Sequence, residues 1–320
     1  MVTSEDVVYA YRLLLDREPE NADVVAHYAS QVSNFRELRE LFINSAEFRE
    51  KLQSAMLPRP PCTPFSGPAM VVEIDASREQ MAALFAKVRA QWQHLGETEP
   101  HWSVLTHEGY FQENFHMNRE AFYASGEMDL KMFDAALTRA GVKRDGMCCC
   151  LELGCGVGRM TTPLASRFEQ VLALDISAAH LRVAQDHLKG WGNVKFRHIE
   201  TIDQLSDVGH FDVLFSRIVL QHNPPPVIAH LMRHLLEQLN PGGVAYFQVP
   251  TYKAGYRFCV EEYLCQKNTT HMEMHFFPQI ALFDLLAKQK CRVMEIREDD
   301  SIGISVTAVS NTLLVQKDGL

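Results

Sequence analysis

The sequence predicts an α/β fold: a seven-stranded sheet, parallel except for its last strand, with a small all-α domain at the N-terminus. From residue 147 onward, apolar strand patterns alternate with helical patterns, and such alternation gives a parallel sheet covered on both faces. The final connection, 299–310, has no clear apolar period, so the last strand is expected to return antiparallel. Residues 1–53 show only helical spacing. The strand patterns lie at 147–153, 170–176, 193–199, 211–216, 243–249, 291–298 and 311–317.

The region before the sheet divides into three predicted parts. Residues 1–56 form a small helical module, in which Ser33 or Asn34 could cap a helix through a side-chain oxygen. Residues 57–70 form a linker, because five prolines between 57 and 68 prevent a helix and favour an extended spacer. Residues 71–146 return to helical spacing ahead of the first strand of the sheet.

The composition argues against a nucleic-acid-binding protein, a membrane-spanning protein and a metal-binding protein. The 320 residues carry a net charge of −9 and no long basic block, so a nucleic-acid partner is not expected. No basic-then-apolar leader and no run of about 18 apolar residues occurs, which predicts a cytoplasmic protein without a membrane span. Three of the eight cysteines are consecutive in a strand pattern and no C-x-x-C pair exists, so no metal site is expected.

A glycine-rich run follows the first strand of the sheet and precedes a helix. It reads Leu-Glu-Leu-Gly-Cys-Gly-Val-Gly-Arg-Met-Thr at 151–161, a G-x-G-x-G spacing rather than the G-x-G-x-x-G of dinucleotide sites. This run resembles motif I of the class I S-adenosylmethionine-dependent methyltransferases. The resemblance implies S-adenosylmethionine as cofactor, a Rossmann-like methyltransferase sheet, and contacts to the amino acid end of the cofactor from Glu152, Gly154, Cys155, Gly156 and Gly158.

Two further positions should hold the nucleoside. Asp175, followed by Ile176, ends the second strand about 20 residues after the glycines, where an acid accepts from ribose hydroxyls. After the third strand, Glu200 and Thr201 resemble the motif that binds adenine. Glu200 replaces the usual Asp there, and Thr201 would offer its backbone N–H; a solvated glutamate at a strand end is the alternative.

The fourth strand leads into Ser216 and Arg217, which the resemblance places near the sulfonium. The later stretch 223–226, Asn-Pro-Pro-Pro, resembles a motif of enzymes that methylate amino groups of nucleic acid or protein. In those enzymes the motif directly follows the strand, whereas here residues 217–222 lie between the strand and the motif. Asn223 is therefore expected to cap the helix that follows.

A methyl transfer to a hydroxyl requires a base, and histidine is suited to that role at neutral pH. His222, after the fourth strand, is the first candidate, with a capping or packing role as the equal alternative; His275 is the second candidate. The insertion after the fifth strand commonly shapes the acceptor pocket in this fold. Tyr252, Tyr256 and Arg257 lie in it and would suit a sugar or an acidic acceptor.

Resemblances outside motif I suggest the acceptor. The stretches 92–106, 220–226 and 248–252 are similar to methyltransferases of bacterial polysaccharide and glycan pathways. The first residues, with Tyr-Arg-Leu-Leu-Leu-Asp-Arg-Glu-Pro at 11–19, resemble a helical module that recurs in bacterial surface-glycan enzymes and secreted proteins. We therefore expect O-methylation of a sugar or glycan precursor, with another small metabolite, or a non-catalytic scaffold that binds S-adenosylmethionine, as alternatives. Residues 1–53 are a structural appendage or the docking site of a protein partner.

In many members of this family the segment before motif I folds over the cofactor as a lid. The same role is expected of residues 71–146. Trp102, Tyr110, Phe111 and Tyr123 could then wall the site, or could pack on the sheet as ordinary aromatic residues.

Overall fold

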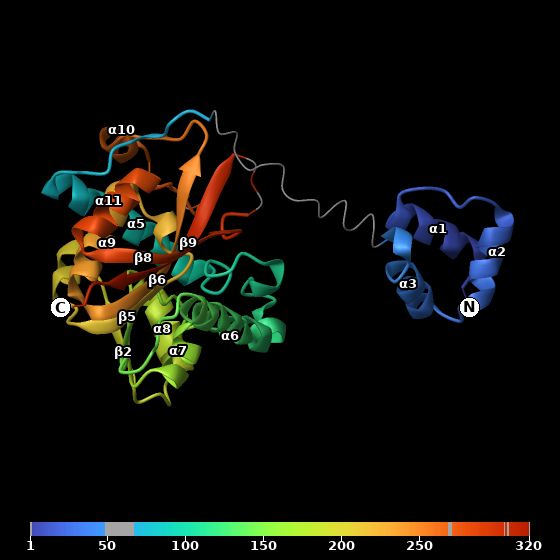
Figure 1. Cartoon of the computed structure of the whole chain (residues 1–320), viewed down its shortest axis with the longest axis horizontal. Coiled ribbons are helices and arrows are strands. Elements are labelled where there is room, and N and C mark those ends of the chain that lie inside the picture. Colours follow the sequence, from blue (N-terminus) through green and yellow to red (C-terminus); the bar gives the residue numbers. More distant parts are fainter. Residues whose placement is uncertain (1, 49–66, 268–270, 304, 306, 320) are drawn as a thin grey trace. The chain divides into compact units, whose positions relative to one another are not determined.

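The computed structural model describes residues 2–48, 67–267, 271–303, 305 and 307–319. The chain divides into two compact units, Met1–Cys62 and Thr63–Leu320 (Figure 1). Residues 49–56 of the predicted module and 57–66 of the predicted linker lie outside the described residues.

The described part of the N-terminal unit includes the helices α1 (Ser4–Leu15), α2 (Ala22–Gln31) and α3 (Phe35–Ile43). Side-chain caps start them. Thr3 and Asp6 form a reciprocal capping box at α1, and Asn34, rather than Ser33, caps α3 by accepting from the Glu37 N–H at 3.0 Å. The apolar positions of the helical period are buried against one another, including Val7, Leu15, Leu38 and Phe42.

The second unit is built on a seven-stranded sheet in the order β4-β3-β2-β5-β6-β9-β8. The first five strands pair in parallel, and β9 lies antiparallel between β6 and β8. This arrangement confirms the predicted fold class, including the antiparallel last strand. The strands are β2 (Cys149–Leu153), β3 (Gln170–Asp175), β4 (Val194–His198), β5 (Phe211–Ser216), β6 (Leu239–Lys253), β8 (Cys291–Asp299) and β9 (Ala308–Lys317). A separate two-stranded pair, β1 (Val71–Val72) with β7 (Arg257–Phe258), was not predicted.

Helices cover both faces of the sheet (Figure 1). Leu151 and Leu214 point into a core shared with α5, α9 and α11, whereas Cys150, Val213 and Phe215 point into a core shared with α6 and α7. Buried parallel strands of this kind are apolar on both faces. The helices are α5 (Arg78–Thr98), α6 (Phe115–Arg139), α7 (Thr161–Arg167), α8 (Ala178–His187), α9 (Pro225–Gln238), α10 (Val260–Cys265) and α11 (Gln279–Lys288), with 3₁₀ turns η1 (Glu108–Tyr110), η2 (Ile202–Asp207) and η3 (Leu220–His222).

The strand order reverses beside β2. The chain passes from β2 outward to β3 and β4, then crosses back so that β5 lies on the other side of β2. Such a reversal leaves a crevice at the carboxyl ends of the strands, where open α/β sheets bind ligands. Within the described part of the chain, no helix is long and apolar enough to cross a membrane.

Candidate functional site

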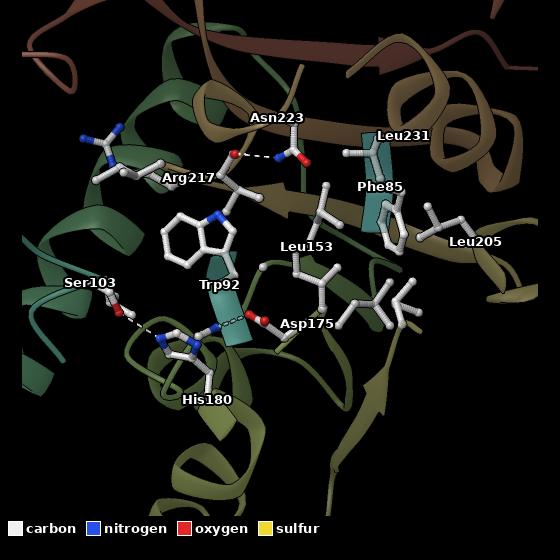
Figure 2. Close-up of a pocket in the computed structure, with 18 residues that line it drawn as sticks. Phe85, Trp92, Ser103, Leu153, Asp175, His180, Leu205, Arg217, Asn223 and Leu231 are labelled. Carbon is white, nitrogen blue, oxygen red and sulfur yellow. Dashed lines mark hydrogen bonds between the residues drawn. The ribbon is translucent and has the colours of Figure 1, made fainter. Parts of the chain in front are cut away.

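A narrow cavity of about 90 Å³ opens at this reversal point (Figure 2). Its walls come from the ends of β2, β3 and β5, from helix α5, and from the turn after α5. Trp92 lies in the middle of the view, with Phe85, Leu205 and Leu231 toward one end and the Ser103–His180 pair toward the other. The other lining residues are Val104, Leu153, Gly154, Gly156, Leu174, Asp175, Ile176, Ile199, Arg217, Ile218, Val219 and Asn223.

The glycine run forms a bend that only glycine accommodates. Gly154, Gly156 and Gly158 have φ angles of +74°, +53° and +87°, in the left-handed region. A Cβ on Gly154 would lie 2.4 Å from Val219, and one on Gly158 would lie 2.7 Å from Leu188. Gly154 and Gly156 therefore bring bare backbone to the cavity, whereas Gly158 serves close packing between the bend and α8.

Asp175 joins the bend to the tip of the neighbouring strand. One carboxylate oxygen accepts from the Gly156 N–H and the other from the Ser177 N–H, each at 2.8 Å. A carboxylate offers about four lone-pair positions, so acceptor capacity remains for a ligand. Asp175 and Ile176 both line the cavity, as expected for the residues at this strand end.

Glu152 lies behind the bend and does not line the cavity. Its side chain is buried and accepts a hydrogen bond from the Thr161 hydroxyl at 2.6 Å. Burial raises the pKa of this carboxyl to about 7, against the opposing effects of the Thr161 hydrogen bond and of Arg159. Cys155 is also buried, and its backbone N–H donates to the Leu174 carbonyl at 3.0 Å, so it fixes the bend from below.

The residues expected at adenine lie in an adjacent second cavity of about 530 Å³, which shares Phe85 with the first. The Gln204 side chain accepts from the backbone N–H groups of Glu200, at 2.7 Å, and Thr201, at 3.3 Å. The N–H expected to meet adenine is thus engaged within the chain. In the first cavity, apolar side chains, including Ile199 and Leu205, form this end.

At the opposite end, Arg217 lines the cavity and joins a buried ion cluster. Its Nε lies 2.6 Å from one oxygen of Asp129, and Arg159 lies 2.7 Å from the other. Ser216 is buried outside the lining, and its hydroxyl donates to the Leu153 carbonyl at 3.3 Å, which ties β5 to β2. Of these two predicted neighbours of the sulfonium, only Arg217 reaches the cavity wall.

His222 lies just outside the lining, with both ring nitrogens engaged. Nδ1 is 2.8 Å from the Glu273 carbonyl, which can only accept, so Nδ1 carries the hydrogen. The Gln221 amide donates to the remaining lone pair on Nε2 at 3.1 Å. Burial lowers the pKa of His222 to about 4, so the ring is neutral near pH 7. Its ring is 5.1 Å from that of Trp92, which lines the cavity.

His275 and Tyr256 come together next to His222. The Tyr256 hydroxyl is 2.9 Å from Nδ1 of His275, and Nε2 of His275 is 3.5 Å from the Glu273 carboxylate. Neither residue lines the cavity. The remaining predicted acceptor residues point elsewhere: the Tyr252 hydroxyl donates to the Pro68 carbonyl, and exposed Arg257 pairs with Glu262 at 2.8 Å.

Several lining residues were not assigned to the site from the sequence. Trp92 and Phe85 fit the helical period of α5, and this spacing alone predicts packing residues rather than a cavity wall. His180, five residues after Asp175 on the first turn of α8, carried a positional signal, because the first turn of a helix after a strand faces the ligand edge of the sheet. Asn223 was expected to cap α9, and this is wrong: α9 follows Pro224 without a side-chain cap, and Asn223 instead donates to the Val219 carbonyl at 2.9 Å.

The four aromatic residues proposed as lid walls pack among their neighbours instead of lining the cavity. Trp102 stacks on Phe111 with ring centroids 5.1 Å apart, and Tyr110 meets Phe122 at 5.0 Å. Tyr123 stacks on His187 at 3.6 Å. The cover of the cavity comes from other residues of the same segment, Trp92, Ser103 and Val104.

Comparisons with known proteins bear on the same region. Trans-aconitate 2-methyltransferase of Deinococcus radiodurans is 43% identical over 104 residues, which cover 31% of this chain and 37% of that protein. Ubiquinone biosynthesis O-methyltransferase of Rickettsia conorii is 28% identical over 156 residues, 46% of this chain and 52% of that protein. The chain thus spans about half or less of the length of these relatives. The solved magnesium protoporphyrin IX methyltransferase of Synechocystis PCC 6803, with bound SAH, superposes with a TM-score of 0.49 at 18% identity, covering 72% of this chain and 98% of that one.

A family model places the glycine bend inside a known domain. The model described as a methyltransferase domain matches residues 150–243, from β2 through the beginning of β6. The match contains the bend, Asp175 and the turn after β5. Residues 150–243 therefore match a methyltransferase domain.

Proposed function

We propose that this chain transfers a methyl group from S-adenosylmethionine to an oxygen atom of a sugar or glycan precursor. The observation that carries the methyl-transfer part is the pairing of a left-handed glycine bend with Asp175 at the reversal point of the sheet. O-methylation is supported by the similarity of this chain to a ubiquinone biosynthesis O-methyltransferase. The glycan acceptor is supported by the sequence resemblances outside motif I.

The residues present fit S-adenosylmethionine. Bare backbone at Gly154 and Gly156 offers a cradle for the amino acid end, and Asp175 has lone pairs left for ribose hydroxyls. The apolar end of the cavity, including Ile199 and Leu205, suits a base. We assign the cofactor contacts to these residues and to Ile176 and Arg217, with Glu152, Cys155, Gly158 and Ser216 fixing the bend and Glu200 and Thr201 beside the adenine end.

The bound cofactor supplies a methyl group already activated by its sulfonium. The chain must orient the acceptor, exclude water and take up a proton. We propose His222 for the proton, because its ring is 5.1 Å from that of Trp92, which lines the cavity, and because Nε2 carries the lone pair once the Gln221 amide releases it. His275 remains the second candidate, and Tyr252, Tyr256 and Arg257 are proposed acceptor contacts. Replacing His222 should lower kcat more than the affinity for S-adenosylmethionine; full activity of His222→Ala across pH would remove this assignment.

A second candidate acceptor is another small metabolite. The relative that acts on trans-aconitate supports it. A chain that binds the cofactor and transfers nothing would instead be a scaffold. Residues 1–53 are proposed as a protein-docking unit, supported by the exposure of Tyr9, Leu13 and Phe35, and their removal should leave methyl transfer to a small acceptor unchanged.

Calorimetry with S-adenosylmethionine, S-adenosylhomocysteine and NAD tests the cofactor first. Asp175→Ala should weaken binding by about 1–3 kcal/mol, the usual effect of removing a buried polar partner, whereas Asp207→Ala, at an exposed position, should not. Binding of NAD in place of both sulfur nucleosides would overturn the proposal. Incubation with methyl-labelled cofactor and matched sets of nucleotide sugars and small acids then identifies the acceptor class, and cofactor binding without transfer to any of them would favour the scaffold.

A further inference from the structure

The turn that follows α5 lies directly over the glycine bend. We call residues Glu99–Leu105 the strap. It is internally bonded, with the Ser103 N–H donating to the Glu99 carbonyl at 3.0 Å and the Leu105 N–H donating to the His101 carbonyl at 3.2 Å. Val104 of the strap covers Gly156 so closely that a Cβ on this glycine would lie 2.8 Å from it.

The cavity beneath the strap is small for the proposed cofactor. It encloses about 90 Å³, below the about 300–1,000 Å³ of typical small-molecule pockets. Trp92 lines this cavity (Figure 2), and Val104 lines it directly over Gly156. A nucleoside with an amino acid tail needs more room above the bend than this cavity offers.

Buried polar contacts to the His180 ring, from Ser103 and from the Pro100 backbone, hold the strap to the α/β core. The Ser103 hydroxyl is 2.8 Å from Nε2 of His180 and also donates to the Pro100 carbonyl at 3.1 Å. Because its hydrogen goes to Pro100, the serine oxygen accepts from Nε2–H of His180. Ser103 is 4% exposed and His180 is 1% exposed, so water does not compete for this bond.

The Nδ1 side of the His180 ring is packed closely against helix α5. Among the described residues, Nδ1 has no hydrogen-bond partner, and burial lowers the pKa of the ring, which keeps it neutral. Helix α5 lies against it at Gly96, where a Cβ would be 2.6 Å from Nδ1 and 2.6 Å from the Ser177 hydroxyl. A glycine within a helix costs about 0.5–1 kcal/mol, and here it permits α5 and the strap to approach α8.

We propose that His180 is a positioning residue that latches the strap over the glycine bend through Ser103, so that cofactor exchange requires this bond to break. The inference rests on the proposed function, because it concerns access to the same cofactor. His180 lies on the first turn of α8, which begins three residues after Asp175. The latch therefore connects the strand end that is proposed to bind ribose to the strap that covers the site. The distinction from a purely structural role is kinetic: the latch sets how fast cofactor leaves.

The test measures dissociation of labelled S-adenosylhomocysteine from the full chain after a chase with unlabelled ligand. Ser103→Ala and His180→Leu should each speed dissociation about five- to tenfold, the effect of losing one buried hydrogen bond, and the double variant should be no faster than either. His180→Gln, which keeps a donor, should restore part of the slow rate. Ser166→Ala is the matched control, because Ser166 also donates to a proline carbonyl three residues earlier, at 2.7 Å, but has no histidine partner.

Each other outcome counts against the latch. Wild-type rates in Ser103→Ala, additive effects in the double variant, or a His180→Gln rate equal to that of His180→Leu would each overturn it. If His180→Leu does not fold, the comparison of Ser103→Ala with Ser166→Ala decides alone. Failure of the proposed function is separate: it appears as a wild-type chain that binds no S-adenosylhomocysteine at all.

Discussion

The buried carboxyl of Glu152 makes the stability of the larger unit depend on pH. In the folded chain its pKa is about 7, against the 4.5 of an ordinary exposed glutamate. Burial is the main cause, because moving a charged carboxylate out of water costs much more free energy than moving the neutral acid, so the protonated form is favoured. A pKa raised by folding means that stability from this group is complete below about pH 4.5 and is lost as the pH rises to about 7.

The magnitude follows from the two pKa values. Their difference, taken at about 1.4 kcal/mol per unit, gives about 3 kcal/mol of unfolding free energy lost between pH 4.5 and 7. Glu152→Gln removes this dependence, because glutamine does not ionise while its Oε1 still accepts from Thr161. The free energy of unfolding of the variant relative to wild type should therefore rise by about 3 kcal/mol from pH 4.5 to pH 8.

Urea unfolding followed by tryptophan fluorescence measures this difference in the correct unit, because Trp92, Trp102 and Trp191 all lie in Thr63–Leu320. Glu120→Gln, at an exposed position, is the control and should track wild type at every pH. A constant difference between Glu152→Gln and wild type from pH 5 to 8 would show that the acid stays ionised in the folded chain. The reasoning from burial would then be wrong.

Three further predictions use the same geometry. Gly154→Ala should weaken binding of S-adenosylhomocysteine at least about tenfold in calorimetry, because alanine resists the positive φ and meets Val219, whereas Gly190→Ala, in open space, should bind as wild type does. Asp129→Asn should lower the urea-derived stability by about 3–5 kcal/mol, since it leaves two buried arginines without their carboxylate; a loss below about 1 kcal/mol would contradict this. If His222 is the base, its pKa of about 4 predicts a kcat that is flat from pH 6 to 8, and an inflection near pH 6.5 would point to another group.

The fold was predictable because its signals are local. Strands β2, β3 and β5 are short, mostly apolar runs, and the loops that follow them carry glycine, proline or a capping residue. The positions of the bend and of Asp175 were predictable for the same reason, because each follows directly from the end of one of two adjacent strands; their contacts to a cofactor stay a prediction. The β1–β7 pair was not predictable, since two-residue strands far apart in the chain have no period of their own.

The cover of the site depends on contacts that the sequence does not display. Trp92 and Gly96 lie one turn apart on α5 and fit a packing helix as well as a cavity wall. The partner of Ser103 is 77 positions away, and nothing in either local pattern joins it to His180. The misassigned Asn223 has a related cause, because a cap is the usual role of asparagine before a helix, whereas here the loop after β5 folds back and offers the Val219 carbonyl instead.

The positions of the two histidine groups connect the chemistry to the cover. His222 is neutral because it is buried, and its ring lies 5.1 Å from that of Trp92, which lines the cavity. Helix α5, which carries Trp92, ends where the strap begins. If the strap opens as proposed, Trp92 is expected to move relative to His222 and to change the hydration of its ring. Since desolvation lowers the pKa of a histidine, opening should raise the pKa of His222 toward 6.5 and closing should lower it again.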